Sequence, residues 1–86
     1  MTTQGQQFSI DGSAVKIISS SNHYQSVVIH TDGAIYIGDS NAVSTSTGFK
    51  LDVGTEGEFM VAPYSELWAI SNGGTTKTTY LLVTVI

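Results

Sequence analysis

Residues 23–38 read HYQSVVIHTDGAIYIG, and this stretch decides the fold class of the 86-residue chain. Apolar and polar side chains alternate along it with a period of two residues, which is typical of a half-buried β-strand. Asp32-Gly33 interrupts the alternation with a turn signal, since glycine tolerates the positive φ that tight hairpins require. The stretch therefore predicts a strand over 23–30, a tight hairpin at Asp32-Gly33, and a partner strand over 34–38.

The same alternation assigns side chains to the two faces of each predicted strand. In the first strand Val27 and Ile29 share one face, and Tyr24, Val28 and His30 share the other. In later segments, Ile35 and Ile37 are expected opposite Tyr36, and Leu67 and Ala69 opposite Trp68 and Ile70.

The rest of the chain repeats this organisation. Short apolar runs are separated by Gly, Ser, Asn and Asp, and no window has helical periodicity. The sequence predicts an all-β single domain over 1–86, a small β-sandwich or jelly-roll-like barrel of seven to eight short antiparallel strands. Residues 1–7, MTTQGQQ, are polar and uncharged and are a candidate flexible N-terminal arm. The further strands are expected at 8–10 (an edge piece), 14–19, 49–53, 58–62, 66–71 and 76–86, with turns at 11–13, 19–22, 54–57, 63–65 and 72–74.

Composition favours the same fold class. Charged residues make up 12% of the chain, about half of the usual share of roughly 25%. Serine and threonine supply eleven residues each, and these favour turns and pleated surfaces rather than helices. Because there is no cysteine, disulfides cannot support this small core, and oligomerisation is the expected support.

The charge balance excludes several classes of partner. The net charge is −4 and Lys16, Lys50 and Lys77 are the only basic side chains besides two histidines. Binding to nucleic acid or to an anionic membrane surface needs a basic footprint that this chain lacks. No segment approaches the ~20 apolar residues of a spanning helix, and residues 1–10 lack the pattern of a signal peptide. The chain is expected to be made in the cytoplasm, and to stay there or to leave it within a larger particle.

The last predicted strand, 76–86, is apolar on both faces. Tyr80 and Leu82 lie on one face, and Leu81, Val83 and Val85 on the other, with Ile86 at the end. In a small sandwich the outer face should be polar. The strand is therefore either central with its outer face partly covered by loops, or part of a subunit contact.

Candidate catalytic groups are few and badly spaced. His23 and His30 are seven residues apart, which places them on opposite faces of one strand, where they cannot share a metal or a substrate. Glu56 and Glu58 are a strand-spaced carboxylate pair, but such a pair needs a cleft and a raised pKa to act as an acid and base.

Two short motifs superficially suggest ligand sites. Residues 39–41, Asp-Ser-Asn, offer oxygen ligands to Ca²⁺ but lack the calcium-loop pattern. Residues 73–77, GGTTK, lack the spacing and the following helix of a phosphate-binding loop, so a hairpin turn is expected there. The sequence predicts that the protein is not an enzyme and has no cofactor or metal.

A resemblance gives these observations a more specific interpretation. Residues 34–51, AIYIGDSNAVSTSTGFKL, contain Y-I-G at the end of a strand, a Ser/Thr/Asn loop and a G-F-x-L step, and residues 66–70, ELWAI, follow as a later strand. This pattern over 34–86 resembles small β-rich virion structural proteins of tailed bacteriophages. The resemblance implies a capsid decoration (cement) protein on the virion surface, made in the host cytoplasm, that bridges subunits of the major capsid protein, with trimers favoured.

Alternatives remain open. Within a virion, the chain is alternatively a tail, neck or head-fibre accessory protein. A different class is a carbohydrate-binding module, which predicts that Trp68 or Tyr64 is exposed beside polar residues, whereas decoration predicts that they are buried. The candidate partner or subunit contacts are Tyr64, Trp68, Tyr80, Leu82 and Ile86.

The Ser/Thr/Asn loop between the strand that ends in Y-I-G and the G-F-x-L step has two interpretations. As a structural connection, it crosses from one sheet to the other, is held by its own side-chain-to-backbone hydrogen bonds, and places Phe49 and Leu51 in the core. Alternatively it contacts the capsid surface directly.

Overall fold

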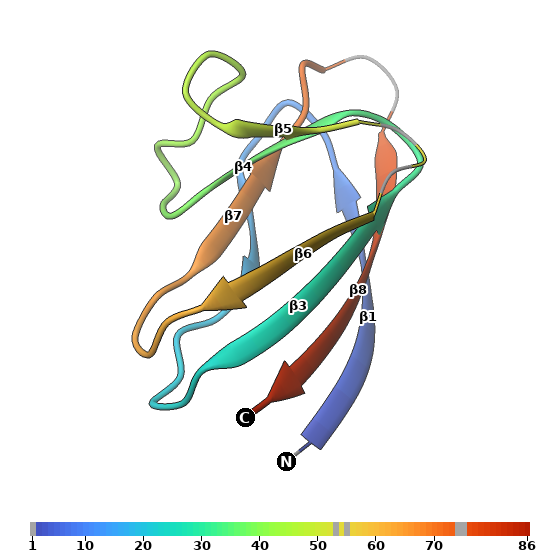
Figure 1. Ribbon diagram of the computed structural model, residues 1–86. Coiled ribbons are helices and arrows are strands. Elements are labelled where there is room, and N and C mark those ends of the chain that lie inside the picture. The colour runs from blue at the N-terminus through green and yellow to red at the C-terminus, as the bar shows by residue number, and fades with distance from the viewer. Residues whose placement is uncertain (1, 53, 55, 74–75) are drawn as a thin grey trace.

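The computed structural model describes residues 2–52, 54, 56–73 and 76–86, which form two packed antiparallel sheets (Figure 1). Sheet A has the strand order β1-β8-β3-β6, and sheet B has the order β2-β7-β4-β5. The predicted all-β single-domain fold is confirmed. The strands are β1 (Thr2–Ile10), β2 (Val15–Ile18), β3 (Gln25–Thr31), β4 (Ile35–Gly38), β5 (Phe49–Leu51), β6 (Glu56–Val61), β7 (Leu67–Ile70) and β8 (Lys77–Val85).

The strand pairing follows the jelly-roll plan. The two halves of the chain pair as one long folded hairpin, β1 with β8, β2 with β7, β3 with β6 and β4 with β5. Lateral pairing of β3 with β8 and of β4 with β7 then completes each four-stranded sheet. The loop between β4 and β5 is the tip of this hairpin (Figure 1). Two four-stranded sheets joined in this way form a double-sheet jelly roll.

The core lies between the two sheets. One of the two faces that alternation assigned to each strand supplies it, and β3 shows this most clearly, since Val27 and Ile29 are fully buried whereas His30 is exposed. The buried cluster also receives residues from β1, β2, β4, β5, β6, β7 and β8. Its members are Ile10, Ile17, Ile18, Val27, Ile29, Ile35, Ile37, Leu51, Val61, Ala69, Leu81 and Val83.

The N-terminal segment differs from the expectation of a flexible arm over 1–7 and an edge piece over 8–10. Residues 2–10 form β1, which pairs with β8 from Thr2 opposite Val85 to Ile10 opposite Lys77. The reason is that β8 is a central strand, so its backbone groups on the side away from β3 need a partner. Polar side chains do not prevent β1 from supplying those hydrogen bonds.

The predicted hairpin at Asp32-Gly33 is wrong, because β3 lies in sheet A and β4 in sheet B. Residues 32–34 instead form a corner that leads the chain from sheet A to sheet B. Asp32 ties this corner to β8, since its N–H donates to the carbonyl of Thr78 at 3.1 Å and its Oδ1 accepts from the N–H of Thr78 at 2.7 Å. Inside the corner the buried hydroxyl of Thr31 donates to the carbonyl of Gly33 at 2.6 Å. Gly33 does not have a positive φ, unlike Gly54, Gly73 and Tyr64.

The polar loop, residues 39–48, does not cross between sheets, because β4 and β5 are neighbours in sheet B. The predicted internal hydrogen bonds are confirmed: the Ser44 hydroxyl accepts from the N–H groups of Ser46 and Thr47, at 3.3 and 3.2 Å. Val43 anchors the loop and is 8% exposed. It packs so closely on Gly38 that a Cβ at that position would lie 2.7 Å from Val43 Cγ2.

Of the two residues that the loop was expected to place in the core, only one is there. Leu51 is buried, but Phe49 is 62% exposed and makes an edge-to-face contact with Phe59, with ring centroids 5.9 Å apart. Five residues lie outside the described part of the chain: Met1, Val53, Thr55, Gly74 and Thr75. Val53 ends the strand expected over 49–53, Thr55 belongs to the turn expected over 54–57, and Gly74 and Thr75 belong to the GGTTK motif, with Gly74 also in the turn expected over 72–74.

Candidate functional site

The outer face of sheet A carries most of the exposed apolar surface. Among the described residues seven large hydrophobic side chains are exposed, and Phe49 and Tyr64 are the two that lie elsewhere. The other five project from β3, β6, β8 and the positions that flank these strands. We define the apolar face as these five and their half-buried neighbour Val28: Tyr24, Val28, Met60, Tyr80, Leu82 and Ile86.

Strand register makes this face continuous. Leu82 of β8 lies opposite Val28 of β3, and Tyr80 lies opposite His30. One step past β8, the N–H of Ile86 donates to the carbonyl of Tyr24 at 2.9 Å. The centre of β8 is neither covered by loops nor polar, since Tyr80 is 42% and Leu82 48% exposed. The expected central position of β8 is confirmed, because it lies between β1 and β3. The loops that were expected to cover its outer face do not bury Tyr80 or Leu82.

Polar groups border the face on two sides. On the β1 side, Gly5 lies opposite Leu82 and Gln7 opposite Tyr80, and a shallow hollow opens there. On the β6 side, Glu58 lies opposite Val28 and Glu56 opposite His30. The four strands and the nine residues of β8 give the whole outer face of sheet A, polar borders included, an outline roughly 20 Å wide and about 30 Å long, or about 600 Å². That outline approaches the ~800 Å² that each partner contributes to a standard protein interface.

A second surface centres on Trp68, on the outer face of sheet B. Glu66 uses both carboxylate oxygens there: Oε1 accepts from the indole Nε1–H of Trp68 at 3.0 Å, and Oε2 lies 3.4 Å from Lys16 Nζ. Lys16 Nζ also lies 5.7 Å from the centre of the Trp68 ring. The hydrogen bond from Trp68, aided by Lys16 and opposed by desolvation, holds the pKa of Glu66 below its ordinary value.

Trp68 is half-buried in this cluster. Its ring does not present an open platform, because a sugar that stacked on the side occupied by Lys16 would have to displace the ammonium group. Tyr64 behaves differently. It is 77% exposed in the turn between β6 and β7, where its φ is 65° and its N–H donates to the carbonyl of Ser21 at 2.6 Å.

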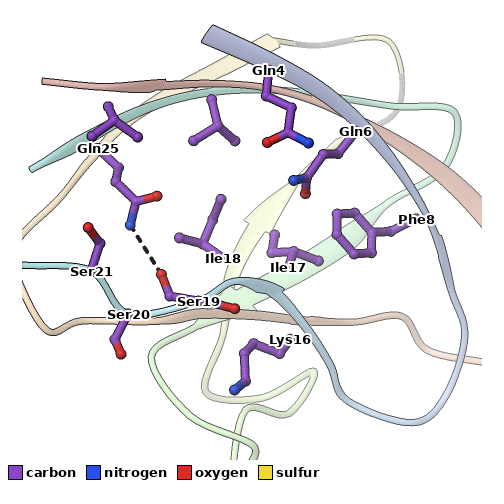
Figure 2. Close-up of a pocket in the computed structure, with 12 residues that line it drawn as sticks. Gln4, Gln6, Phe8, Lys16, Ile17, Ile18, Ser19, Ser20, Ser21 and Gln25 are labelled. Atoms are coloured by element: carbon purple, nitrogen blue, oxygen red, sulfur yellow. Dashed lines mark hydrogen bonds between the residues drawn. The ribbon is translucent and has the colours of Figure 1, made fainter. Parts of the chain in front are cut away.

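A groove of about 360 Å³ lies between β1 and β2, which are edge strands of the two sheets (Figure 2). Gln4 and Gln6 project from β1 toward its interior, and Gln25 Nε2 donates to the Ser19 carbonyl at 3.1 Å (Figure 2). Its apolar lining includes Ile18 and Val83. Lys16 is the only titratable side chain in the lining, so the groove has no acid–base pair for catalysis.

Of the candidate catalytic groups, His30 and Glu56 are brought together as cross-strand partners of β3 and β6. Within the described residues no three His, Cys, Asp or Glu side chains gather into a possible metal site. His30 lies on the apolar face with its ring centroid 6.1 Å from that of Tyr80, whereas His23 is in the exposed connection before β3. No helix capable of crossing a membrane occurs in the described part of the chain.

The structure brings together three of the five sequence candidates, Tyr80, Leu82 and Ile86, on the apolar face. Trp68 lies on the outer face of the other sheet, and Tyr64 lies in a turn. Sequence reasoning did not select Tyr24 or Met60. For Tyr24 a signal existed, since alternation placed it on the same face as Val28. Met60 had no local signal, because its position depends on the pairing of β6 with β3.

Comparisons with known proteins identify the fold. No family model matches the chain, and no curated protein matches it. A solved structure of Bacillus endospore appendages, described as a novel family of disulfide-linked pili, aligns with a TM-score of 0.70 and 14% identity, over 95% of this chain and 81% of that one. A de novo designed double-stranded β-helix, solved by solution NMR, aligns with a TM-score of 0.66 and 9% identity, over 94% of this chain and 99% of that one.

These two likenesses support the jelly-roll architecture. Neither structure is a phage capsid decoration protein, and at such low identity the likeness extends to the fold alone. The disulfide linkage of the appendage pili is not available to this chain, because it contains no cysteine.

Proposed function

We propose that the chain is a structural subunit of a larger protein assembly and docks on a partner protein through the apolar face of sheet A. The observation that carries this proposal is the concentration of Tyr24, Met60, Tyr80, Leu82 and Ile86 on one flat sheet face. Exposed apolar patches that are bordered by polar residues often mark protein–protein interaction sites. An apolar centre at Leu82 and Val28, two tyrosines in the same face and a polar border match the general anatomy of interfaces.

The energetics fit a subunit that binds in many copies. Burying apolar surface stabilises a contact by roughly 25 cal/mol per Å², but lost rigid-body freedom and side-chain ordering offset much of this gain. One face of this size gives a modest affinity. On a repeating lattice, where each copy touches more than one neighbour, modest contacts reinforce each other.

For the kind of assembly, we propose a tailed-phage virion, with the chain as a capsid decoration protein on the outside of the shell. The likeness of residues 34–86 to small virion proteins supports this choice. The partner is then the major capsid protein. Tail, neck or head-fibre placement uses the same docking face and differs in the number of copies per particle.

A filament subunit is the second candidate, because the appendage pilus protein has a similar fold. In that case the contacts between subunits are non-covalent. The carbohydrate-binding alternative now depends on Tyr64, because the ring of Trp68 is engaged by Lys16.

Two measurements test the proposal. Quantitative mass spectrometry of purified virions gives the ratio of this chain to the major capsid protein. A simple fraction set by lattice symmetry supports decoration, a few copies support the tail or neck, and absence from the virion overturns the virion assignment. In parallel, particles that lack the chain are incubated with purified protein and pelleted.

The binding assay uses a matched pair of variants. Leu82→Glu places a charge at the centre of the apolar face and is expected to abolish co-sedimentation with the particles. Ala42→Glu places the same charge on the exposed loop beyond β4 and is expected to bind like the unmodified chain. If Leu82→Glu binds normally while Ala42→Glu does not, the docking face is the polar loop instead.

A further inference from the structure

The four edge strands of the sandwich are unequal in their protection against pairing. Sheet A ends in β1 and β6, and sheet B ends in β2 and β5. The outer side of an edge strand presents unpaired N–H and C=O groups that invite another strand to pair. Proteins normally block such pairing with charged side chains, proline, bulges or very short strands.

Three of the four edges have such protection. Strand β6 carries Glu56 and Glu58. Strand β2 has only four residues, one of which is Lys16, and its pairing with β7 is interrupted by a bulge between Lys16 and Ile18. Strand β5 has three residues, including Lys50.

Strand β1 has none of these features. It is nine residues long, with the sequence TTQGQQFSI, and contains no charged residue and no proline. It pairs with β8 in unbroken register over its whole length, so no bulge turns it away from solvent. Its free side borders the groove of Figure 2, and no other strand of the described chain pairs with it there.

We propose that β1 pairs in antiparallel fashion with β1 of a second copy of this chain across a two-fold axis. The two copies of sheet A then form one continuous eight-stranded sheet. An uncharged strand pairs with itself without the like-charge repulsion that β6 would experience. A full overlap of nine residues provides about eight hydrogen bonds between the copies.

This pairing is self-limiting. Because a two-fold contact uses the same strand of both copies, and because the remaining edges are charged or short, the assembly closes at two chains. The pairing also brings the two apolar faces onto the same side of one wider sheet. The inference is independent of the proposed function, since the edge contact leaves the apolar face open.

The test is the concentration dependence of mass in sedimentation equilibrium, at low salt and with a substitution pair. The unmodified chain is expected to approach twice its 9.1 kDa mass. Gln7→Lys places an exposed charge on β1, opposite Gly5 of the second copy and diagonal to its own copy across the axis, and is expected to raise the dimer dissociation constant at least about tenfold, an effect that salt reduces. Ser26→Lys places the same charge on the same side of the sheet, on the interior strand β3, and is expected to leave dimerisation unchanged.

Hydrogen exchange gives a second readout that does not depend on a variant. Every second amide of a free edge strand faces solvent, whereas all amides of a paired interior strand are protected. The solvent-side amides of β1 are expected to be protected at high protein concentration and to exchange rapidly on dilution. Circular dichroism confirms that each variant is folded before it is compared.

Other outcomes overturn the inference. A monomer at all concentrations, or a trimer, is incompatible with two-fold pairing of a single edge. If Ser26→Lys dissociates the dimer and Gln7→Lys does not, the copies associate through their apolar faces. Binding of the Gln7→Lys variant to particles is measured separately. If this variant binds, the proposed docking function holds whether or not the unmodified chain dimerises.

Discussion

Ile86 and Tyr24 are joined by a backbone hydrogen bond of 2.9 Å, from the N–H of Ile86 to the carbonyl of Tyr24. This bond continues the pairing of β3 and β8 one step beyond both strands. It places the two side chains, 58% and 52% exposed, next to each other at the end of sheet A. The apolar face therefore extends from Tyr80 to the end of the sandwich, so that its contact area is set by strand register rather than by a mobile loop.

The buried hydroxyls of Thr31 and Thr79 are expected to differ in their contribution to stability. Thr79 Oγ1 donates to Thr31 Oγ1 at 3.3 Å, and Thr31 Oγ1 donates to the carbonyl of Gly33 at 2.6 Å. The N–H of Gly33 also donates to Thr31 Oγ1, at 3.4 Å. Thr31→Val removes all three of these hydrogen bonds and is expected to lower the free energy of unfolding by about 1–3 kcal/mol. Thr79→Val removes only the outer donor and is expected to lower it by less than ~1 kcal/mol. Urea denaturation measures both, and an equal loss in the two variants would contradict this network.

The glycines at positions 38 and 5 provide a matched test of how the polar loop is held. A Cβ at Gly38 would lie 2.7 Å from Val43 Cγ2, whereas the nearest atom to a Cβ at Gly5 is the Leu81 carbonyl oxygen at 3.9 Å. Gly38→Ala is therefore expected to destabilise the fold by about 1–3 kcal/mol through overpacking. Gly5→Ala is expected to be neutral or to stabilise by up to about 1 kcal/mol. Thermal denaturation distinguishes the two, and a neutral Gly38→Ala would mean that Val43 moves freely.

Glu66 gives the fold a defined pH dependence. Because the hydrogen bond from Trp68 and the Lys16 ammonium lower the pKa of Glu66 from its ordinary 4.5, the unfolded chain binds its proton first as the pH falls. The stabilisation by Glu66 is thus complete above that ordinary value and is lost as the pH falls through the lower, folded-state pKa.

Trp68 reports this titration directly, since it is the only tryptophan. We expect a change in its fluorescence with a midpoint below pH 4.5, the ordinary pKa of Glu66. Glu66→Gln should remove the transition, and Glu58→Gln, on the other sheet, should retain it. A transition that persists in Glu66→Gln would show that another group controls the emission of Trp68.

The parts of the fold that depend on local periodicity could be predicted from the sequence. Alternation grouped Val27 with Ile29 on one face, and Tyr80 and Leu82 on the opposite face from Leu81 and Val83, and the structure confirms both groupings. The same reasoning could not choose strand partners. Asp32-Gly33 carries a hairpin signal, but β3 pairs with β6 and β8, which are distant in the sequence.

The part of the apolar face that depends on local periodicity could be predicted, and the part that depends on strand pairing could not. Tyr80, Leu82 and Ile86 belong to one strand and its extension, so alternation was enough to group them. Met60 joins them only because β6 pairs with β3, which brings residues 25–31 beside 56–61. Pairing between the two halves of a jelly roll is long-range, and no short window of sequence contains it.

Hydroxyl-radical footprinting of the assembled particle, compared with the free chain, tests the central claim most directly. Met60, Tyr24 and Tyr80 are exposed in the free chain and should all react there. If sheet A docks through its apolar face, these three side chains will be protected in the particle, while Phe49, exposed on β5, will remain reactive. Full reactivity of Met60 and Tyr80 in the particle, with protection of Phe49, would contradict the account.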